Sequence, residues 1–291
     1  MGKKDLFNKV RKKLNSHQLY TVSSGAICDV GNRRSNNEDN FLLVGQINDK
    51  MENHREAASI IQLKEKDWVA YGVFDGMGGC EAGEIAAILA AGKFEENTRK
   101  SRLRSKEDVD SVARYCYQES NQAIIKKQRE LNSLLGTTGT AVFTNGREFK
   151  VFHLGDSRAY LFRNGILGQI TRDQTLAEMK IQTGAYHRGD LEELKDRHKL
   201  VCYIGCDEES QAVMPEESIW IEVKPGDRIL LCSDGLYDMC SDEEILSVFH
   251  ELDATSDILN KLQSLAKGHG GKDNVTCLLI TFHMVRDEKR V

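Results

Sequence analysis

Short apolar runs bounded by polar residues predict β-strands from residue 20 onward. The segment 41–44 is one such run, and 68–74 is a stronger one, rich in aromatic and β-branched residues. Three strands follow in quick succession at 138–144, 148–154 and 159–163, separated by the turn-forming pairs Asn145-Gly146 and Gly155-Asp156. We expect these three strands to form one antiparallel meander.

Longer segments with apolar residues at helical spacing predict helices. They cover 81–97, 106–132, 242–252 and 255–267, whereas 173–204 is polar and mixed with one helical stretch near 190–198. Later strands are expected at 218–223, 228–231 and 275–283. Strands and helices are therefore grouped rather than alternating, which predicts an α+β fold of mainly antiparallel sheets covered by helix pairs instead of a doubly wound parallel sheet.

Composition limits the protein class. A length of 291 residues with 40% hydrophobic residues allows one large domain with a sizeable core. The 40 basic and 45 acidic residues give a net charge of −5, which argues against a general nucleic-acid binder. The eight cysteines include no C-x-x-C pair and read as buried thiols of a reducing compartment. No signal peptide and no apolar run of roughly 18 residues is found, so a cytoplasmic protein without a transmembrane segment is expected.

Residues 1–19 form a basic N-terminal extension. Leu6, Phe7, Val10 and Leu14 would share one helical face, with lysines and Arg11 around it. We favour a solvated helix packed on the domain over contact with a membrane surface or a partner.

Acidic turns recur at the ends of the apolar runs. Asp75, Asp156 and Asp234 each follow such a run, whereas Asp273 and the pair Glu38-Asp39 precede one. Each alone is explained as a favoured turn residue. Together they predict carboxylates that converge at one edge of packed sheets, where their mutual repulsion requires a cation.

The donor atoms in this pattern are all oxygens, which suit magnesium, manganese or calcium rather than zinc. Gly76 and Gly235 let the backbone approach closely, so that a carbonyl can join the ligands. Two such ions about 3.5–4 Å apart would polarise a water and hold a phosphoryl group. The P-loop and protein-kinase motifs are absent, as is an Asp-x-Asp nucleophile. The sequence therefore predicts metal-dependent hydrolysis of phosphate esters without a protein nucleophile.

At this point the chain resembles the metal-dependent type 2C serine/threonine protein phosphatases, as a bacterial-like single-domain member. Six motifs over residues 20–283 occur in the family's order, which makes the resemblance specific. The motifs are Gly31–Asp39 (GNRRSNNED), Val73–Gly79 (VFDGMGG), Gly136–Thr140 (GTTGT), Leu154–Tyr160 (LGDSRAY), Cys232–Asp238 (CSDGLYD) and Gly271–Thr276 (GKDNVT).

The resemblance implies a four-layer α-β-β-α sandwich at residues 20–285, with a flap insert near 173–204, and a role for each motif residue. Asp75 would bridge two Mn²⁺ or Mg²⁺ ions with the Gly76 carbonyl on one of them, and Asp234 and Asp273 would hold the other. The remaining implied roles are metal-bound waters for Asp39, with Glu38 behind it, a third-metal site for Asp156 with Asp234, phosphate binding for Arg34, and orientation of Asp273 by Asn274.

The implied mechanism is in-line attack on phosphorus by a water that bridges the two metals, while Arg34 and the ions offset the growing charge. Animal members of the family carry a histidine where Met77 stands, and a thioether cannot protonate the leaving serine or threonine. Bacterial members share this methionine, which leaves a metal-bound water as the expected acid. His153 is expected to be a strand residue and not the missing acid. The flap begins with Asp173-Gln174 where relatives have Asp-His, and its Arg188 has no assigned contact.

Three functions follow from these observations. The leading one is a protein-serine/threonine phosphatase that acts as a monomer on phosphorylated proteins, among them a serine/threonine kinase and its targets. A catalytically weak phosphoprotein-binding regulator of the same fold is the alternative. A calcium-binding structural module is disfavoured because EF-hand spacing is absent and Arg34 would have no role.

Overall fold

Two β-sheets stacked face to face organise the chain in a computed structural model that describes residues 20–64, 66–78, 82–187, 196–206 and 213–284. Within these residues one sheet has the strand order β3-β1-β13-β12-β8-β9, and its paired strands are antiparallel. Its strands are β1 (Tyr20–Asp29), β3 (His54–Leu63), β8 (Arg158–Arg163), β9 (Ile166–Gln169), β12 (Arg228–Cys232) and β13 (Val275–Met284).

The second sheet has the order β10-β7-β6-β4-β2, with two short strands added at its sides. Its long strand β4 pairs with β2 on one side and β6 on the other. Its strands are β2 (Asp39–Leu43), β4 (Val69–Gly78), β5 (Leu135–Thr137), β6 (Gly139–Thr144), β7 (Glu148–Leu154), β10 (Glu216–Glu217) and β11 (Ile221–Glu222).

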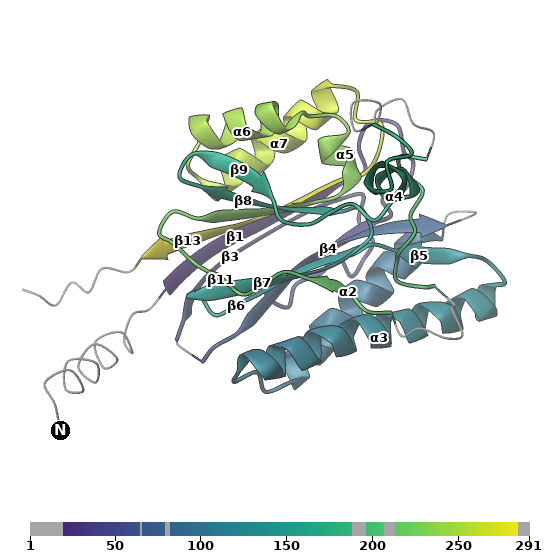
Figure 1. Cartoon of the computed structure of the whole chain (residues 1–291), viewed down its shortest axis with the longest axis horizontal. Coiled ribbons are helices and arrows are strands. Elements are labelled where there is room, and N and C mark those ends of the chain that lie inside the picture. Colours follow the sequence, from purple (N-terminus) through teal and green to yellow (C-terminus); the bar gives the residue numbers. More distant parts are fainter. Residues whose placement is uncertain (1–19, 65, 79–81, 188–195, 207–212, 285–291) are drawn as a thin grey trace, which may run out of the picture.

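Helices cover the outer face of each sheet, so the four-layer α-β-β-α sandwich is confirmed (Figure 1). The pair α6 and α7 lies on the first sheet, and α2 and α3 lie on the second. Capping boxes at Ser105 and Ser241 start α3 and α6, because each serine accepts from the third helical amide while that residue's carboxylate returns to the cap. The helices are α2 (Gly83–Lys100), α3 (Lys106–Leu131), α4 (Leu176–Gln182), α5 (Asp234–Tyr237), α6 (Asp242–Glu251) and α7 (Thr255–Gly268).

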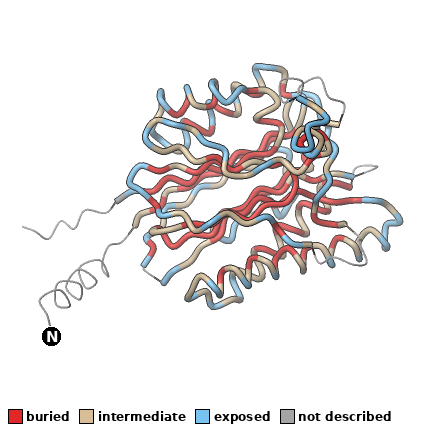
Figure 2. Tube along the Cα trace, in the orientation of Figure 1, coloured by how far each residue is buried: buried red, intermediate tan, exposed pale blue. Residues whose placement is uncertain are grey.

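Three apolar clusters fill the spaces between the layers (Figure 2). Phe41, Val73, Leu231 and Ile280 belong to the cluster between the sheets, where both inner faces are buried. The outer clusters join each sheet to its helices, with Phe74 packing edge-to-face on Phe94 below the second sheet. The two sheets are therefore held in one relative position, which places their strand ends beside each other. No helix among the described residues is both long enough and apolar enough to cross a membrane.

The predicted meander is wrong at its third strand. β6 and β7 pair as expected, but β8 pairs with β12 and β9 in the other sheet. Gly155, at φ +106°, turns the chain out of the second sheet, and Ala159 then joins the cluster between the sheets while Tyr160 faces α6 and α7. A turn dipeptide predicts a reversal but does not specify which sheet the next strand joins.

The polar half of the chain also departs from the pattern. Of the strand predicted at 218–223 only Ile221–Glu222 (β11) is observed, and β10 lies just before the predicted range at Glu216–Glu217. Between them the Ser218 hydroxyl accepts from the Val151 amide at 3.0 Å, in place of a backbone carbonyl. The flap contains α4, which periodicity did not predict. The expected helical stretch near 190–198 lies largely outside the described residues, as do Arg188 and the extension 1–19.

Candidate metal centre

The candidate site begins with two aspartates on adjacent strands of the second sheet. Asp39 opens β2 and faces Asp75 of β4 directly in the antiparallel register. The backbone of Asp75 is held from its other side, because its carbonyl accepts from the Thr138 amide at 2.8 Å and its amide donates to the Thr138 hydroxyl at 2.9 Å. The position of Asp75 is thus set by ladder pairing and by buried hydrogen bonds.

Gly76 follows in a position that only glycine fills. A Cβ there would lie 2.1 Å from the Gly83 carbonyl oxygen and 2.5 Å from that of Glu38. A Cβ on Gly83 would in turn lie 2.8 Å from both the Gly76 carbonyl oxygen and the Glu38 carboxyl carbon. The close approach brings a backbone oxygen and a side-chain carboxylate to one corner of the site.

The first sheet contributes Asp156, Asp234 and Asp273 to the same edge. Cys232 pairs with Arg158 on one side and with Cys277 on the other, so the chain beyond Cys232 and before Arg158 and Cys277 emerges at one end. The five predicted aspartates therefore come from both sheets and meet at a single edge of the sandwich.

A cavity of about 410 Å³ occupies this edge. It is lined by every predicted site residue except Asp39, which is 3% exposed and lies beneath it, hydrogen-bonded to the Ser233 hydroxyl at 2.7 Å. The lining consists of Arg34, Glu38, Asp75, Gly76, Met77, Gly78, Thr138, Asp156, His198, Leu200, Asp234, Asp238, Asp273 and Asn274.

Carboxylates packed this closely resist ionisation. Burial and the neighbouring carboxylates raise the pKa of Asp39 to about 7, and they raise the pKa of Asp75 and Asp156 well above the usual range. The pKa of Asp234 is raised as well, first by burial and against the effect of its hydrogen bond with His198. A bound cation would remove this repulsion.

Arg34 lies at the mouth of the cavity with its side chain half-exposed. Its guanidinium donates to the Asp273 carboxylate at 2.7 Å and lies 3.9 Å from Glu38. The hydrogen bond with Asp273 raises the pKa of Arg34, so the group is cationic throughout the accessible pH range. Arg33 beside it is exposed and does not line the cavity.

Asn274 acts on the loop before β2 and not through its side chain on Asp273. Its side-chain oxygen accepts from the Glu38 amide at 2.8 Å, and its side-chain nitrogen donates to the carbonyls of Val30 and Asn36. Asn274 reaches the Asp273 carboxylate through its backbone amide, which donates to it at 2.8 Å. Asn274 therefore joins the loop that carries Arg34 to the strand that follows Asp273.

His153 occupies a buried position in β7 and does not line the cavity, as expected from the sequence. One ring nitrogen lies 2.8 Å from the Thr140 hydroxyl and the other 3.0 Å from the Arg172 carbonyl. Met77 does line the cavity, so no imidazole is present at that point of the site.

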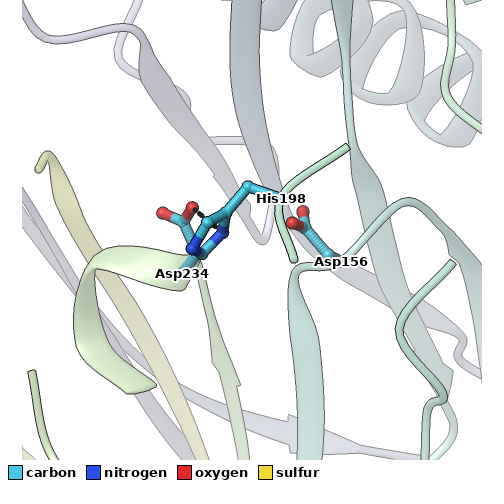
Figure 3. Close-up of side chains that lie close together, drawn as sticks. All are labelled: Asp156, His198 and Asp234. Carbon is cyan, nitrogen blue, oxygen red and sulfur yellow. Dashed lines mark ion pairs between the residues drawn. The ribbon is translucent and has the colours of Figure 1, made fainter. Parts of the chain in front are cut away.

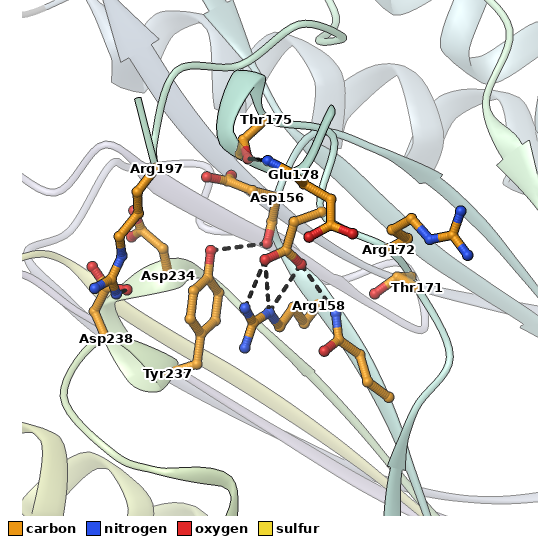
Figure 4. A network of polar contacts seen from close by, with 12 residues as sticks. Asp156, Arg158, Thr171, Arg172, Thr175, Glu178, Arg197, Asp234, Tyr237 and Asp238 are labelled. Carbon is orange, nitrogen blue, oxygen red and sulfur yellow. Dashed lines mark hydrogen bonds and ion pairs between the residues drawn. The ribbon is translucent and has the colours of Figure 1, made fainter. Parts of the chain in front are cut away.

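The start of the flap is anchored to the site by a polar network (Figure 4). Arg158 makes a bidentate ion pair with Asp173 and lies 3.6 Å above the ring of Tyr237, whose hydroxyl donates to the Asp156 carbonyl. The amide of Gln174 donates to the Gly155 carbonyl, and its side-chain oxygen accepts from the Gly155 amide. The pair Asp173-Gln174 thus positions the turn that presents Asp156.

His198 is a titratable residue of the site that the sequence did not predict (Figure 3). It comes from the far end of the flap, and its Nδ1 lies 3.4 Å from Asp234 while its Nε2 lies 3.1 Å from Asp238. These two hydrogen bonds raise the pKa of His198 to about 10 in the metal-free protein. The signal in the sequence is weak: Asp234 and Asp238 stand one helical turn apart, which calls for a cation between them.

The residues fit a hard divalent metal centre. Carboxylates from both sheets converge with raised pKa values, and the Gly76 carbonyl lies in the same corner, as oxygen donors of this kind require. One set of candidate ligands, Asp156, His198 and Asp234, offers atoms that all lie within 4.8 Å of one another. The sequence analysis expected only oxygen donors, and His198 adds a nitrogen donor at this corner.

Comparisons with known proteins identify the family. The protein phosphatase 2C family model matches residues 24–180, more than half of the chain. The serine/threonine phosphatase stp of Listeria monocytogenes is 28% identical over 212 residues, covering 72% of this chain and 82% of that protein. The serine/threonine protein phosphatase PstP of Mycobacterium tuberculosis is 34% identical over 212 residues, but this region is only 38% of its length.

Solved structures agree with these relatives. The catalytic domain of PstP in complex with two manganese ions has a TM-score of 0.72 to this chain at 28% identity, covering 91% of this chain and 99% of that one.

Proposed function

This chain belongs to the protein phosphatase 2C family of serine/threonine protein phosphatases, and we propose that its aspartate edge holds the metal ions that this chemistry needs. Asp75 with the Gly76 carbonyl, Asp234 and Asp273 would hold two Mn²⁺ or Mg²⁺ ions, as two manganese ions are bound in the related PstP domain. The observation that carries this assignment is the meeting of carboxylates from both sheets in one cavity with Arg34 at its mouth.

When bound, the ions would supply an acidified water as nucleophile and positive charge beside the phosphoryl oxygens. Asp39 lies beneath the cavity and accepts a hydrogen bond from Ser233. It would act on the ions through their bound waters, with Glu38 behind it. Arg34 would turn its guanidinium fork from Asp273 to the phosphate, whose two oxygens match its geometry. Met77 supplies no proton, so water at the open mouth of the cavity would protonate the departing alkoxide.

The substrates we propose are phosphoserine and phosphothreonine in proteins, among them a serine/threonine kinase and its targets. The cavity is open and polar, which suits a phosphorylated side chain presented by a protein surface. We also propose that the enzyme acts in the cytoplasm as a monomer. Five buried cysteines of the described residues remain thiols, including Cys232 and Cys277 on paired strands, as a reducing compartment allows.

Turnover of two substrates tests the proposal. Purified protein with Mn²⁺ should hydrolyse p-nitrophenyl phosphate and a phosphothreonine peptide, and a chelator should abolish both reactions until Mn²⁺ is returned. Asp234→Asn should abolish turnover while the far-ultraviolet circular dichroism spectrum stays that of wild type.

Glu243→Gln is a matched control, because this carboxylate is exposed in the first turn of α6 and does not line the cavity. It should retain wild-type turnover. Wild-type protein that binds the phosphopeptide with Mn²⁺ present but releases no phosphate would overturn the proposal and favour the phosphoprotein-binding regulator.

A further inference from the structure

We propose that His198 is a nitrogen ligand of a metal site formed with Asp156 and Asp234, which ties the flap to the metal centre and favours transition metals over magnesium. The inference rests on the proposed metal role of Asp234. It adds a donor of a different chemical class, contributed by a segment outside both sheets.

The first observation is the arrangement of the three side chains. Asp156 comes from the turn between β7 and β8, Asp234 from the first residue of α5, and His198 from the flap above them (Figure 3). One ligand atom from each lies within 4.8 Å of the others. An ion bound at about 2.0–2.2 Å from each requires donor atoms no more than about 4.4 Å apart, so a small side-chain movement would bring all three onto it.

The second observation is the burial of the Asp156 carboxylate. The residue is 5% exposed, and no hydrogen bond or ion pair from another described side chain reaches its carboxylate. The backbone carbonyl of Asp156 accepts from Tyr237, but the carboxylate itself points into the cavity toward His198 (Figure 3). A buried carboxylate of this kind is costly unless a cation binds it.

The third observation is how the imidazole is oriented. Its Nε2 lies 3.1 Å from the Asp238 carboxylate, and Asp238 in turn pairs with Arg197. This carboxylate accepts a hydrogen bond from the Nε2–H group, and the ring is thereby oriented with Nδ1 toward Asp234 and Asp156. Histidines that bind metals characteristically donate a hydrogen bond from the N–H of their second ring nitrogen to a carboxylate in this way. Asp238 is therefore a positioning residue for His198.

The nitrogen donor determines the choice of metal. Magnesium binds oxygen ligands in strict octahedral geometry, whereas imidazole suits transition metals. Two carboxylates with one imidazole thus prefer Mn²⁺ over Mg²⁺ at this corner, while the all-oxygen ligands Asp75 and Asp273 accept either ion. Because His198 belongs to the flap, binding at this site holds the flap against α5.

Binding of Mn²⁺ alone to the full chain tests the inference. Free Mn²⁺ is counted by electron paramagnetic resonance for wild type, His198→Ala and the control His187→Ala, which removes an exposed histidine of the same flap. We expect His198→Ala to weaken the site of lowest Mn²⁺ affinity by at least about 10-fold, since even the partners of ligands contribute 10- to 100-fold. The affinity for Mg²⁺ should change less than twofold, and His187→Ala should bind both ions as wild type does.

A spectroscopic readout identifies the ligand directly. Electron spin-echo envelope modulation of the Mn²⁺-loaded wild type should contain a nitrogen coupling that shifts with ¹⁵N-histidine and is lost in His198→Ala. Asp238→Asn keeps the imidazole, so it should retain the coupling with an intermediate loss of affinity. If His198 only neutralised the two carboxylates, His198→Ala would bind Mn²⁺ as tightly as wild type or more tightly, and the inference would be overturned.

Turnover of p-nitrophenyl phosphate by the same samples separates the two proposals. Wild type that hydrolyses the substrate but shows no nitrogen coupling would overturn the His198 assignment and leave the proposed function intact. Wild type that shows the nitrogen coupling but no turnover would support the His198 assignment and overturn the proposed function.

Discussion

The cavity has two walls that are built differently. One consists of strand ends: Asp75 is held by the register of β4 against β2 and by Thr138, and Asp234 lies two residues beyond the end of β12. The other is the flap, which is held by ion pairs such as Arg158 with Asp173 and Arg197 with Asp238. Ladder pairing and packing position the first wall independently of charge, whereas the second depends on charge and on the occupant of the cavity. The metal ligands that need accurate placement come mainly from the first wall.

The largest expected effect follows from removing a proposed metal ligand from the strand-end wall. Asp75→Asn removes the carboxylate proposed to bridge both metals, which we expect to lower kcat on p-nitrophenyl phosphate with Mn²⁺ by on the order of 10³-fold, equivalent to several kcal/mol. The same substitution should raise the melting temperature of the metal-free protein at pH 7, because it removes a buried carboxylate whose ionisation is resisted by its neighbours. A metal-free variant that melts below wild type would show that Asp75 is structurally required.

Substitutions in the flap wall should lower the stability of the protein more than they lower its turnover. Arg158→Met leaves Asp173, 17% exposed, without its bidentate partner, and we expect the free energy of unfolding to fall by about 3 kcal/mol in urea titrations. Arg99→Met is the control, since Arg99 pairs with Glu95 on the surface of α2 with 65% of its side chain exposed, and it should cost less than about 0.5 kcal/mol. Equal losses in the two variants would mean that the flap is not anchored by this pair.

Arg34 lies between the two walls at the mouth of the cavity, and its substitution tests the proposed binding of phosphate. Arg34→Ala should raise KM for a phosphothreonine peptide and lower kcat/KM by about 10- to 100-fold, the effect of losing a charge-assisted bidentate contact of about 1.5–3 kcal/mol. Arg33→Ala, at an exposed residue outside the cavity lining, should change kcat/KM less than twofold. An unchanged KM in Arg34→Ala would contradict its proposed role.

The smallest effect is a pH dependence that differs with and without metal. The raised pKa of Asp39, about 7, means that the folded protein binds more protons than the unfolded chain between pH 3.8 and 7, so its stability rises as pH falls through that window. The raised pKa of His198 acts with the same sign: its stabilisation is complete below pH 6.5 and is lost as pH rises through about 10. Allowing for the partly exposed His198 ring, we expect the metal-free protein to gain about 1–2 kcal/mol from pH 8 to pH 6.

Saturating Mn²⁺ should reverse this slope, because protons then compete with the metal for the same ligands. Thermal unfolding at several pH values, with and without Mn²⁺, measures both slopes. His198→Ala should flatten the metal-free slope above pH 7, and a slope that is unaffected by Mn²⁺ would contradict metal binding at these aspartates.

Much of the strand-end wall was predictable from local sequence. Asp75, Asp156 and Asp234 follow apolar runs, and a strand buried on both faces is recognisable by such a run because it must exclude polar side chains. The flap was not predictable in this way. Helix α4 has only seven residues, too few for a clear helical periodicity, and the importance of His198 depends on Asp234 and Asp238, which lie far along the chain.

The amino-acid sequence by itself determined the α+β class, with antiparallel sheets covered by helix pairs, the acidic turns and, through six ordered motifs, the family. These features are local, because hydrophobic periodicity and turn residues act over a few neighbours. Tertiary structure alone decided that β8 crosses to the other sheet, that Asp39 lies beneath the cavity and that His198 reaches Asp234. Each of these depends on which surfaces pack together, and the packing of two sheets and a flap is set by contacts between residues distant in the chain.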